Sequence, residues 1–192
     1  LTPITMRFYL FVFLGAFSFA QAQVVEQTRP LSGGATAHFT TETTDTLNPP
    51  FVDDFSYGSD RPTQELWSDQ DVWINDAMPL FQNSIGVATF DGCNAFGKPY
   101  QPGNITTNGI SDQLSSNYIN LQGATNVWLS FQYQRAGRGE APSSSDSLVV
   151  LFYSPVDSTW TQVWGEKGTS NADAFKTAMI PVTGSQFLKK GF

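Results

Sequence analysis

Two long stretches with strand-like spacing of apolar residues constrain the fold of this chain more than any other feature. In the first stretch, residues 126–134, apolar side chains occupy every second position: Val127, Leu129, Phe131 and Tyr133. This alternation is typical of a strand with one face in a core. The second stretch, residues 146–154, is apolar on both faces, which predicts a strand deep inside a sandwich. A polar segment rich in Gly, Pro and Ser, residues 135–145, joins them.

Shorter segments of similar character occur on both sides of this pair. We expect strands at residues 51–57, 72–75, 84–90, 114–121, 159–164 and 175–182, and from Phe187 onward. No stretch keeps a helical period across three turns. The chain contains 16 glycines and 11 prolines, which are common in turns. Many short strands separated by turns predict an all-β fold, an antiparallel two-sheet β-sandwich or a barrel.

The N-terminal residues have the pattern of a secretory signal. A short positive start at Arg7 precedes the nearly continuous apolar run 8–19 and a small-x-small motif that ends at Ala22. The apolar run is shorter than the roughly 20 residues that cross a bilayer, so we expect no membrane span in the mature chain. The sequence therefore predicts a signal peptide at 1–22, with an over-extended start at 1–5. Cleavage near Ala22 would yield a secreted or cell-surface protein.

The segment that follows the predicted signal differs in composition from the rest of the chain. Residues 23–50 are rich in Thr and poor in apolar residues, and they end in Asn-Pro-Pro. Such a segment cannot bury enough apolar surface to fold, so we expect a disordered linker. The folded domain is predicted at 51–192. Because the chain stops at Phe192, just as another strand begins, we expect that closing strands are missing.

The charge balance argues against two classes of partner. The chain has a net charge of −7 and a sequence pI near 4.4. A surface of this sign is repelled by phosphate backbones, so no nucleic acid is expected as a partner. It also lacks the basic patch that docks proteins on anionic lipid.

The sequence offers little for catalysis. Cys93 is the only cysteine and His38 the only histidine, and His38 lies in the predicted linker. A cysteine nucleophile, a Ser-His-Asp site and a zinc site each need a well-held histidine or several such ligands. Carboxylate pairs for glycoside hydrolysis are available in number, but no strand presents them in a suitable run. We therefore expect that this segment is not an enzyme, although a larger parent protein could be one.

Three carboxylates are candidates for a structural calcium site. Asp53 and Asp54 lie at a predicted strand start, and Asp91 lies at a predicted strand end. Carboxylate oxygens are the ligands that calcium prefers. The alternative is that these residues are turn residues that bond their own backbone, as Asp commonly does.

One face of the first long strand is the candidate ligand-binding surface. Trp128, Ser130, Gln132 and Gln134 alternate with the apolar residues and so share this face. A flat ring beside hydroxyl and amide groups suits a sugar, which stacks and hydrogen-bonds at once. The alternative is that Trp128 is covered by another layer of the fold. The remaining tryptophans are assigned to the core: Trp67, Trp73, Trp160 and Trp164.

Three motifs together support a family resemblance. They are I-G-V-A-T-F-D-G at 85–92, V-W-L-S-F-Q-Y-Q at 127–134 and D-S-L-V-V-L-F-Y at 146–153. The chain from 51 to 192 resembles the MAM-like, concanavalin-type jelly-roll domain near the N-terminus of large secreted proteins of gliding bacteria. Those proteins typically carry a sorting domain for type IX secretion.

The resemblance implies both a fold and a function. The fold would be a jelly roll, and a structural calcium would be in keeping with related domains. The function would be that of a non-catalytic binding or adhesion module of a larger exported protein, with a glycan or a cell-surface protein as partner. Two alternatives stay open: an N-terminal accessory domain of a secreted hydrolase or peptidase, and a purely structural spacer.

Overall fold

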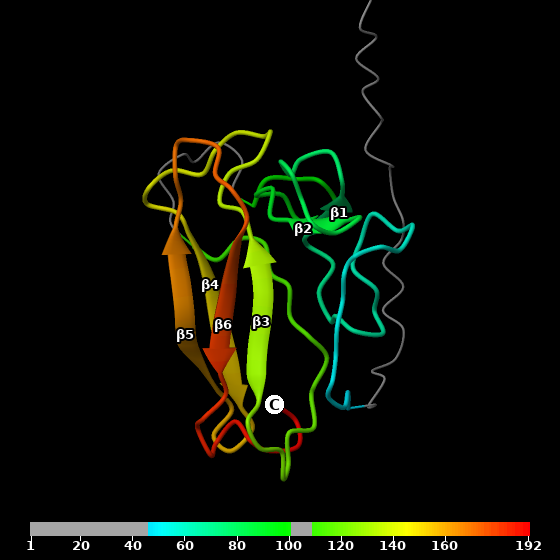
Figure 1. Ribbon diagram of the computed structural model, residues 1–192, viewed down its shortest axis with the longest axis vertical. Helices are drawn as coiled ribbons and strands as arrows, with labels where there is room; N and C mark the ends of the chain where they lie inside the picture. The colour runs from blue at the N-terminus through cyan, green and yellow to red at the C-terminus, as the bar shows by residue number, and fades with distance from the viewer. Residues whose placement is uncertain (1–45, 101–108) are drawn as a thin grey trace, which may run out of the picture. The chain divides into compact units, whose positions relative to one another are not determined.

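The computed structural model describes residues 46–100 and 109–192. The predicted signal peptide, His38 and most of the predicted linker lie outside these residues. Within them the chain forms antiparallel strands and no helix (Figure 1), which confirms the all-β prediction. Among the described residues there is accordingly no helix with the length and apolar character needed to cross a membrane.

The strands form three antiparallel pairs in the described part of the chain. The pairs are β1 (Trp73–Asn75) with β2 (Val87–Thr89), β3 (Trp128–Tyr133) with β6 (Lys176–Pro181), and β4 (Ser147–Ser154) with β5 (Thr159–Lys167). The two strands predicted as the centre of the fold are thus β3 and β4. They belong to different sheets, because β3 pairs with β6 whereas β4 pairs with β5.

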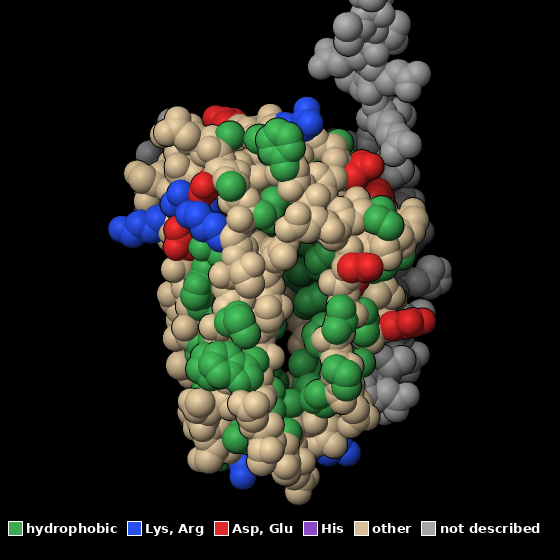
Figure 2. Space-filling model, in the orientation of Figure 1, with side chains coloured by type: hydrophobic (Ala, Val, Ile, Leu, Met, Phe, Trp, Pro, Cys, Tyr) green, Lys and Arg blue, Asp and Glu red, His purple; other side chains and the backbone are tan. Residues whose placement is uncertain are grey.

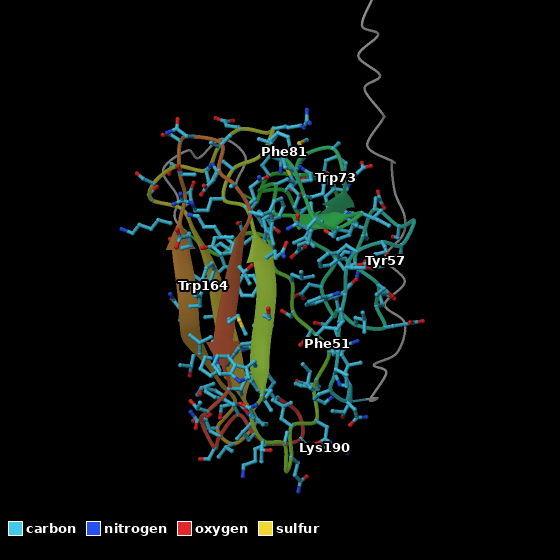
Figure 3. The ribbon with its side chains drawn as sticks, in the orientation of Figure 1. Phe51, Tyr57, Trp73, Phe81, Trp164 and Lys190 are labelled. Carbon is cyan, nitrogen blue, oxygen red and sulfur yellow. The ribbon has the colours of Figure 1, made fainter. Side chains whose placement is uncertain are left out.

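The β3–β6 and β4–β5 sheets share one core, as in a β-sandwich (Figure 1). The residues that make the core come from all four strands and from the flanking loops: Leu121, Leu129, Phe131, Val150, Phe152, Val163, Trp164, Ile180, Val182 and Phe187. The Phe131 ring of β3 meets the Trp164 ring of β5 edge to face, with centroids 5.2 Å apart. Figure 3 labels Trp164, whose assignment to the core is confirmed.

The C-terminal residues pack on this core without forming a strand. Phe152 contacts the rings of Phe187 and Phe192, with centroids 5.5 Å and 5.2 Å away. The backbone of Phe192 exchanges hydrogen bonds with Ile119, from N to O and from O to N. The strand predicted from Phe187 onward is therefore wrong: a turn and a single bridge at Lys190 replace it.

The predicted strand at 114–121 is also wrong, for a reason that the pairing makes clear. Its residues form isolated bridges to three different segments: Ser116 to Trp67, Ile119 to Leu47, and Asn120 to Lys190. No single partner runs alongside it, so no continuous ladder forms. The bridge at Leu47 also shows that backbone pairing includes a residue of the predicted linker.

The predicted strand at 51–57 is replaced by turns that its own side chains stabilise. Asp53 accepts a hydrogen bond from the backbone N–H of Phe55, and Asp54 accepts one from that of Ser56. Such local bonds offer the backbone an alternative to a sheet ladder. Phe55 is left-handed, with φ of +53°, which a strand does not allow.

The outward side of β4 and β5 differs from the expectation of a fully buried strand. Val149 and Leu151 on β4 are 42% and 41% exposed, and Trp160 on β5 is 57% exposed. Among the described residues no third layer covers this side, so the prediction that Trp160 belongs to the core is wrong. Its ring instead packs on the surface against Tyr153, with centroids 5.1 Å apart.

An ion-pair network links the two sheets at one end of the sandwich. Arg135, which follows β3, contacts Asp173 at 2.6 Å and Glu166 of β5 at 3.2 Å. Lys176 of β6 reaches the same Asp173 carboxylate at 3.1 Å. Figure 2 shows basic and acidic side chains gathered over this end of the strands. The hydrogen bond from Arg135, followed by that from Lys176, lowers the pKa of Asp173.

Phe152→Ala tests whether the shared core carries the stability of the sandwich. Phe152 is only 4% exposed, so the change leaves a cavity and lowers the free energy of unfolding by about 3–5 kcal/mol. Urea denaturation measures the loss. Leu151→Ala, at the exposed neighbouring position, is the matched control and should cost far less. Equal losses for the two variants would contradict the assigned faces of β4.

Asp173→Asn tests the network through its pH dependence. A carboxyl group with a lowered folded pKa stabilises the fold above its unfolded pKa of about 3.9, and this contribution is lost as the pH falls through the folded value. The variant should therefore melt below the wild type at neutral pH, and the difference should shrink in acid. Calorimetry across this range measures it.

The control for this effect is the same substitution in an Arg135→Gln background, where the two changes should not be additive. A melting difference that stays constant with pH would show that Asp173 acts through packing and not through its charge.

Candidate functional site

The outward face of the β3–β6 sheet brings together the residues predicted to bind a ligand. Register places three exposed pairs on this face: Trp128 with Pro181, Ser130 with Met179, and Gln132 with Thr177. Inward residues alternate with them, so the alternation predicted for this strand is confirmed. Figure 2 shows apolar side chains gathered over β3 and β6. We call these six residues the β3–β6 face.

Trp128 is the most prominent residue of the β3–β6 face. Its side chain is 50% exposed, so the alternative of a covered core tryptophan does not hold among the described residues. Its indole Nε1 donates a hydrogen bond of 3.0 Å to Oδ1 of Asn126. Asn126 has φ of +57°, a left-handed conformation that Asn tolerates better than most residues. This hydrogen bond favours one orientation of the ring, and half of the residue's surface stays open to contact.

The centre of the face combines polar and apolar groups. Ser130 is exposed and lies opposite Met179, which is 63% exposed. Farther along, the Oε1 of Gln132 accepts a hydrogen bond of 2.8 Å from Nδ2 of Asn83. The Gln132 amide is therefore oriented by a neighbouring loop. A ligand on this face would meet a thioether and a hydroxyl beside an oriented amide.

Gln134 has a different role from the one its position in the sequence suggests. Its Oε1 accepts a hydrogen bond from the backbone N–H of Leu80, and its Nε2 donates to the carbonyl oxygens of Leu80 and Asp173. All three bonds are 3.0 Å or shorter. Both the oxygen and the nitrogen of the amide are thus engaged, and Gln134 anchors two loops. A role in ligand binding stays a prediction for this residue.

A hollow of about 350 Å³ opens beside Trp128, where β3 begins and β6 ends. Trp128 and Pro181 line it from the sheet. The flanking loops supply the rest of its lining, including Ala124, Val182 and Leu188. Sequence reasoning missed this hollow because its walls come from segments more than 50 residues apart, which only the β3–β6 pairing brings together.

The three candidate calcium ligands do not form a metal-binding group. Asp53 is occupied by hydrogen bonds, since its Oδ2 accepts from the indole N–H of Trp67 at 2.6 Å and from the hydroxyl of Tyr57 at 3.2 Å. Burial, with a smaller contribution from the Asp53 charge, raises the pKa of Tyr57 to about 12. Asp54 and Asp91 each bond the backbone of their own turn.

This arrangement agrees with the alternative that the three carboxylates are turn residues. In the parts of the chain that the structure describes, no three His, Cys, Asp or Glu residues lie together as metal ligands would. A structural calcium stays a prediction from the sequence resemblance.

The surroundings of Cys93 raise its thiol pKa, which does not favour a role as a nucleophile. A reactive cysteine needs a lowered thiol pKa, usually from a neighbouring positive charge. Here burial raises the pKa of Cys93, and the nearby charges of Asp91 and Asp112 raise it further. This environment disfavours the thiolate, which is the reactive form of cysteine.

Asp112 and Tyr100 form a second cluster that the sequence did not reveal. Oδ2 of Asp112 accepts a hydrogen bond of 2.8 Å from the backbone N–H of Gly92. Oδ1 of Asp112 and the Tyr100 hydroxyl are both buried, and neither has a well-formed hydrogen bond within the described residues. Burial is the main cause that raises the pKa of both groups.

Comparison of the chain with protein-family models, with curated proteins and with solved structures finds no match. The resemblance to MAM-like jelly-roll domains therefore stays a prediction from the motifs.

Gln134→Leu separates an anchoring role from a binding role. The substitution keeps a side chain of similar length but removes three hydrogen bonds, so it should lower the free energy of unfolding by about 1–3 kcal/mol. Urea denaturation measures this loss. Gln132→Leu, two residues earlier on the exposed face, is the control and should change stability little. A Gln134→Leu protein as stable as the wild type would contradict the anchoring role.

Proposed function

We propose that this chain is a non-catalytic binding module of an exported protein, and that it holds a glycan or a cell-surface protein on the β3–β6 face. The observation that carries the proposal is the Trp128 ring, which is half exposed yet held in place by Asn126. A side chain that is already ordered loses little conformational entropy when a ligand contacts it. Aromatic rings that are exposed and ordered are common binding anchors.

The residues around Trp128 form, together with it, a surface of apolar and polar side chains. Pro181 lies directly across the sheet, and Met179 is the next outward residue on β6. Exposed apolar side chains that gather on one face typically mark an interaction site, whereas isolated ones do not. Ser130, Gln132 and Thr177 add hydroxyl and amide groups that can fix the orientation of a ligand.

The export part of the proposal rests on the N-terminal sequence. The apolar run 8–19 and the motif that ends at Ala22 are typical of a secretory signal. A jelly-roll topology, which would suit this function, is supported by the motif resemblance and by the paired antiparallel sheets around one core. The raised pKa of Cys93 fits a module without a cysteine nucleophile.

Trp128→Ala tests the proposal directly. Wild-type and variant domains are applied to a glycan array and to an array of cell-surface proteins. We expect a ligand for the wild type, and a loss of affinity of about tenfold or more in the variant, because a stacked aromatic contact contributes about 1 kcal/mol beyond its buried area.

Trp160→Ala is the matched control, since it removes an equally exposed tryptophan from the other sheet. Its affinity should match that of the wild type. The proposal fails if the wild type binds nothing on either array, or if the two tryptophan variants bind equally well.

A further inference from the structure

The residues that line the hollow beside Trp128 indicate which kind of ligand it could hold. All nine residues that line it are uncharged. Its apolar walls include Ala124, Val127 and Leu188, and its polar groups come from Thr125, Asn126 and Thr183. A volume of about 350 Å³ lies at the small end of the range for ligand pockets and suits a ring-sized group better than an extended peptide.

The polar groups of the hollow suit a sugar ring. A threonine hydroxyl both donates and accepts hydrogen bonds, as the hydroxyls of a sugar do. The Oδ1 of Asn126 is engaged by the Trp128 indole, which leaves the Asn126 amide nitrogen to act as a donor. The Trp128 ring at the rim offers a flat surface on which the apolar side of a sugar ring can stack.

The absence of charged residues in the lining favours a neutral sugar over an acidic one as the ligand. A carboxylate placed against these uncharged walls would give up part of its hydration without gaining an ion pair from the lining, which is unfavourable. An acidic sugar, such as a uronic or sialic acid, is therefore disfavoured in the hollow.

From these observations we infer that the hollow beside Trp128 is a subsite for one ring of an uncharged sugar, at the end of a glycan that runs along the β3–β6 face. This inference rests on the proposed function and specifies its ligand. Outward residues from Trp128 to Gln132 cover about 13 Å of strand, which gives the rest of a short oligosaccharide a track to follow. Ser130 and Thr177 lie along that track.

The test uses free disaccharides and a variant that fills the hollow. Saturation-transfer NMR and calorimetry compare neutral probes (maltose, cellobiose, lactose and mannobiose) with an acidic probe, a uronic-acid disaccharide. We expect at least one neutral probe to bind the wild type and the acidic probe to bind at least about tenfold more weakly. Thr183→Trp, which fills the hollow with a bulky ring, should weaken the neutral probe by about tenfold or more.

Gln162→Trp is the control, because it places the same ring at an exposed position of β5 on the other sheet, across from the outward residue Leu151. It should leave binding unchanged, and calorimetric melting checks that both variants fold. The inference is overturned if no neutral probe binds, if the acidic probe binds as well as the neutral one, or if Thr183→Trp binds like the wild type. If Trp128→Ala abolishes binding of an array ligand while Thr183→Trp does not, the subsite fails but the proposed function stands.

Discussion

The contact on which the rest of the structure depends is the meeting of inward side chains from two short sheets. Each sheet has only two strands in the described part of the chain, and a two-stranded sheet is marginal by itself. Packing Phe131 of β3 against Trp164 of β5, and Phe152 of β4 against Phe187 and Phe192, joins them into one core. The outward positions are then fixed by alternation, and these are the positions open to a ligand.

The two outward faces carry similar residues but differ in how those residues are held. Trp160 on the β4–β5 sheet contacts the ring of Tyr153, with the two rings tilted by 51° and their centroids 5.1 Å apart. Trp128 on the β3–β6 sheet is held from its edge, through the indole N–H, and borders a hollow. A hydrogen bond at the ring edge does not cover the ring face. This bond and the adjoining hollow, and not exposure, distinguish Trp128 from Trp160.

Side chains that the sequence marks as chemical candidates often serve the fold instead. Asp53 bonds Phe55, Tyr57 and Trp67, and Gln134 ties two loops to the end of β3. In both cases a polar group lies beside backbone or ring N–H groups that need a partner, and satisfying them stabilises the loops. Such residues resemble site residues in a sequence because burial and hydrogen bonding leave no trace there.

The sequence by itself determined the strands at the centre of this protein and the face that each side chain of β3 takes. Side-chain direction alternates strictly along a strand, so Leu129 and Phe131 had to point opposite to Trp128 and Ser130. Only the tertiary structure decided which strands pair, that Trp160 is exposed, and that a hollow forms where β3 begins and β6 ends. Those outcomes depend on contacts between segments far apart in the chain, and local spacing carries no information about such contacts.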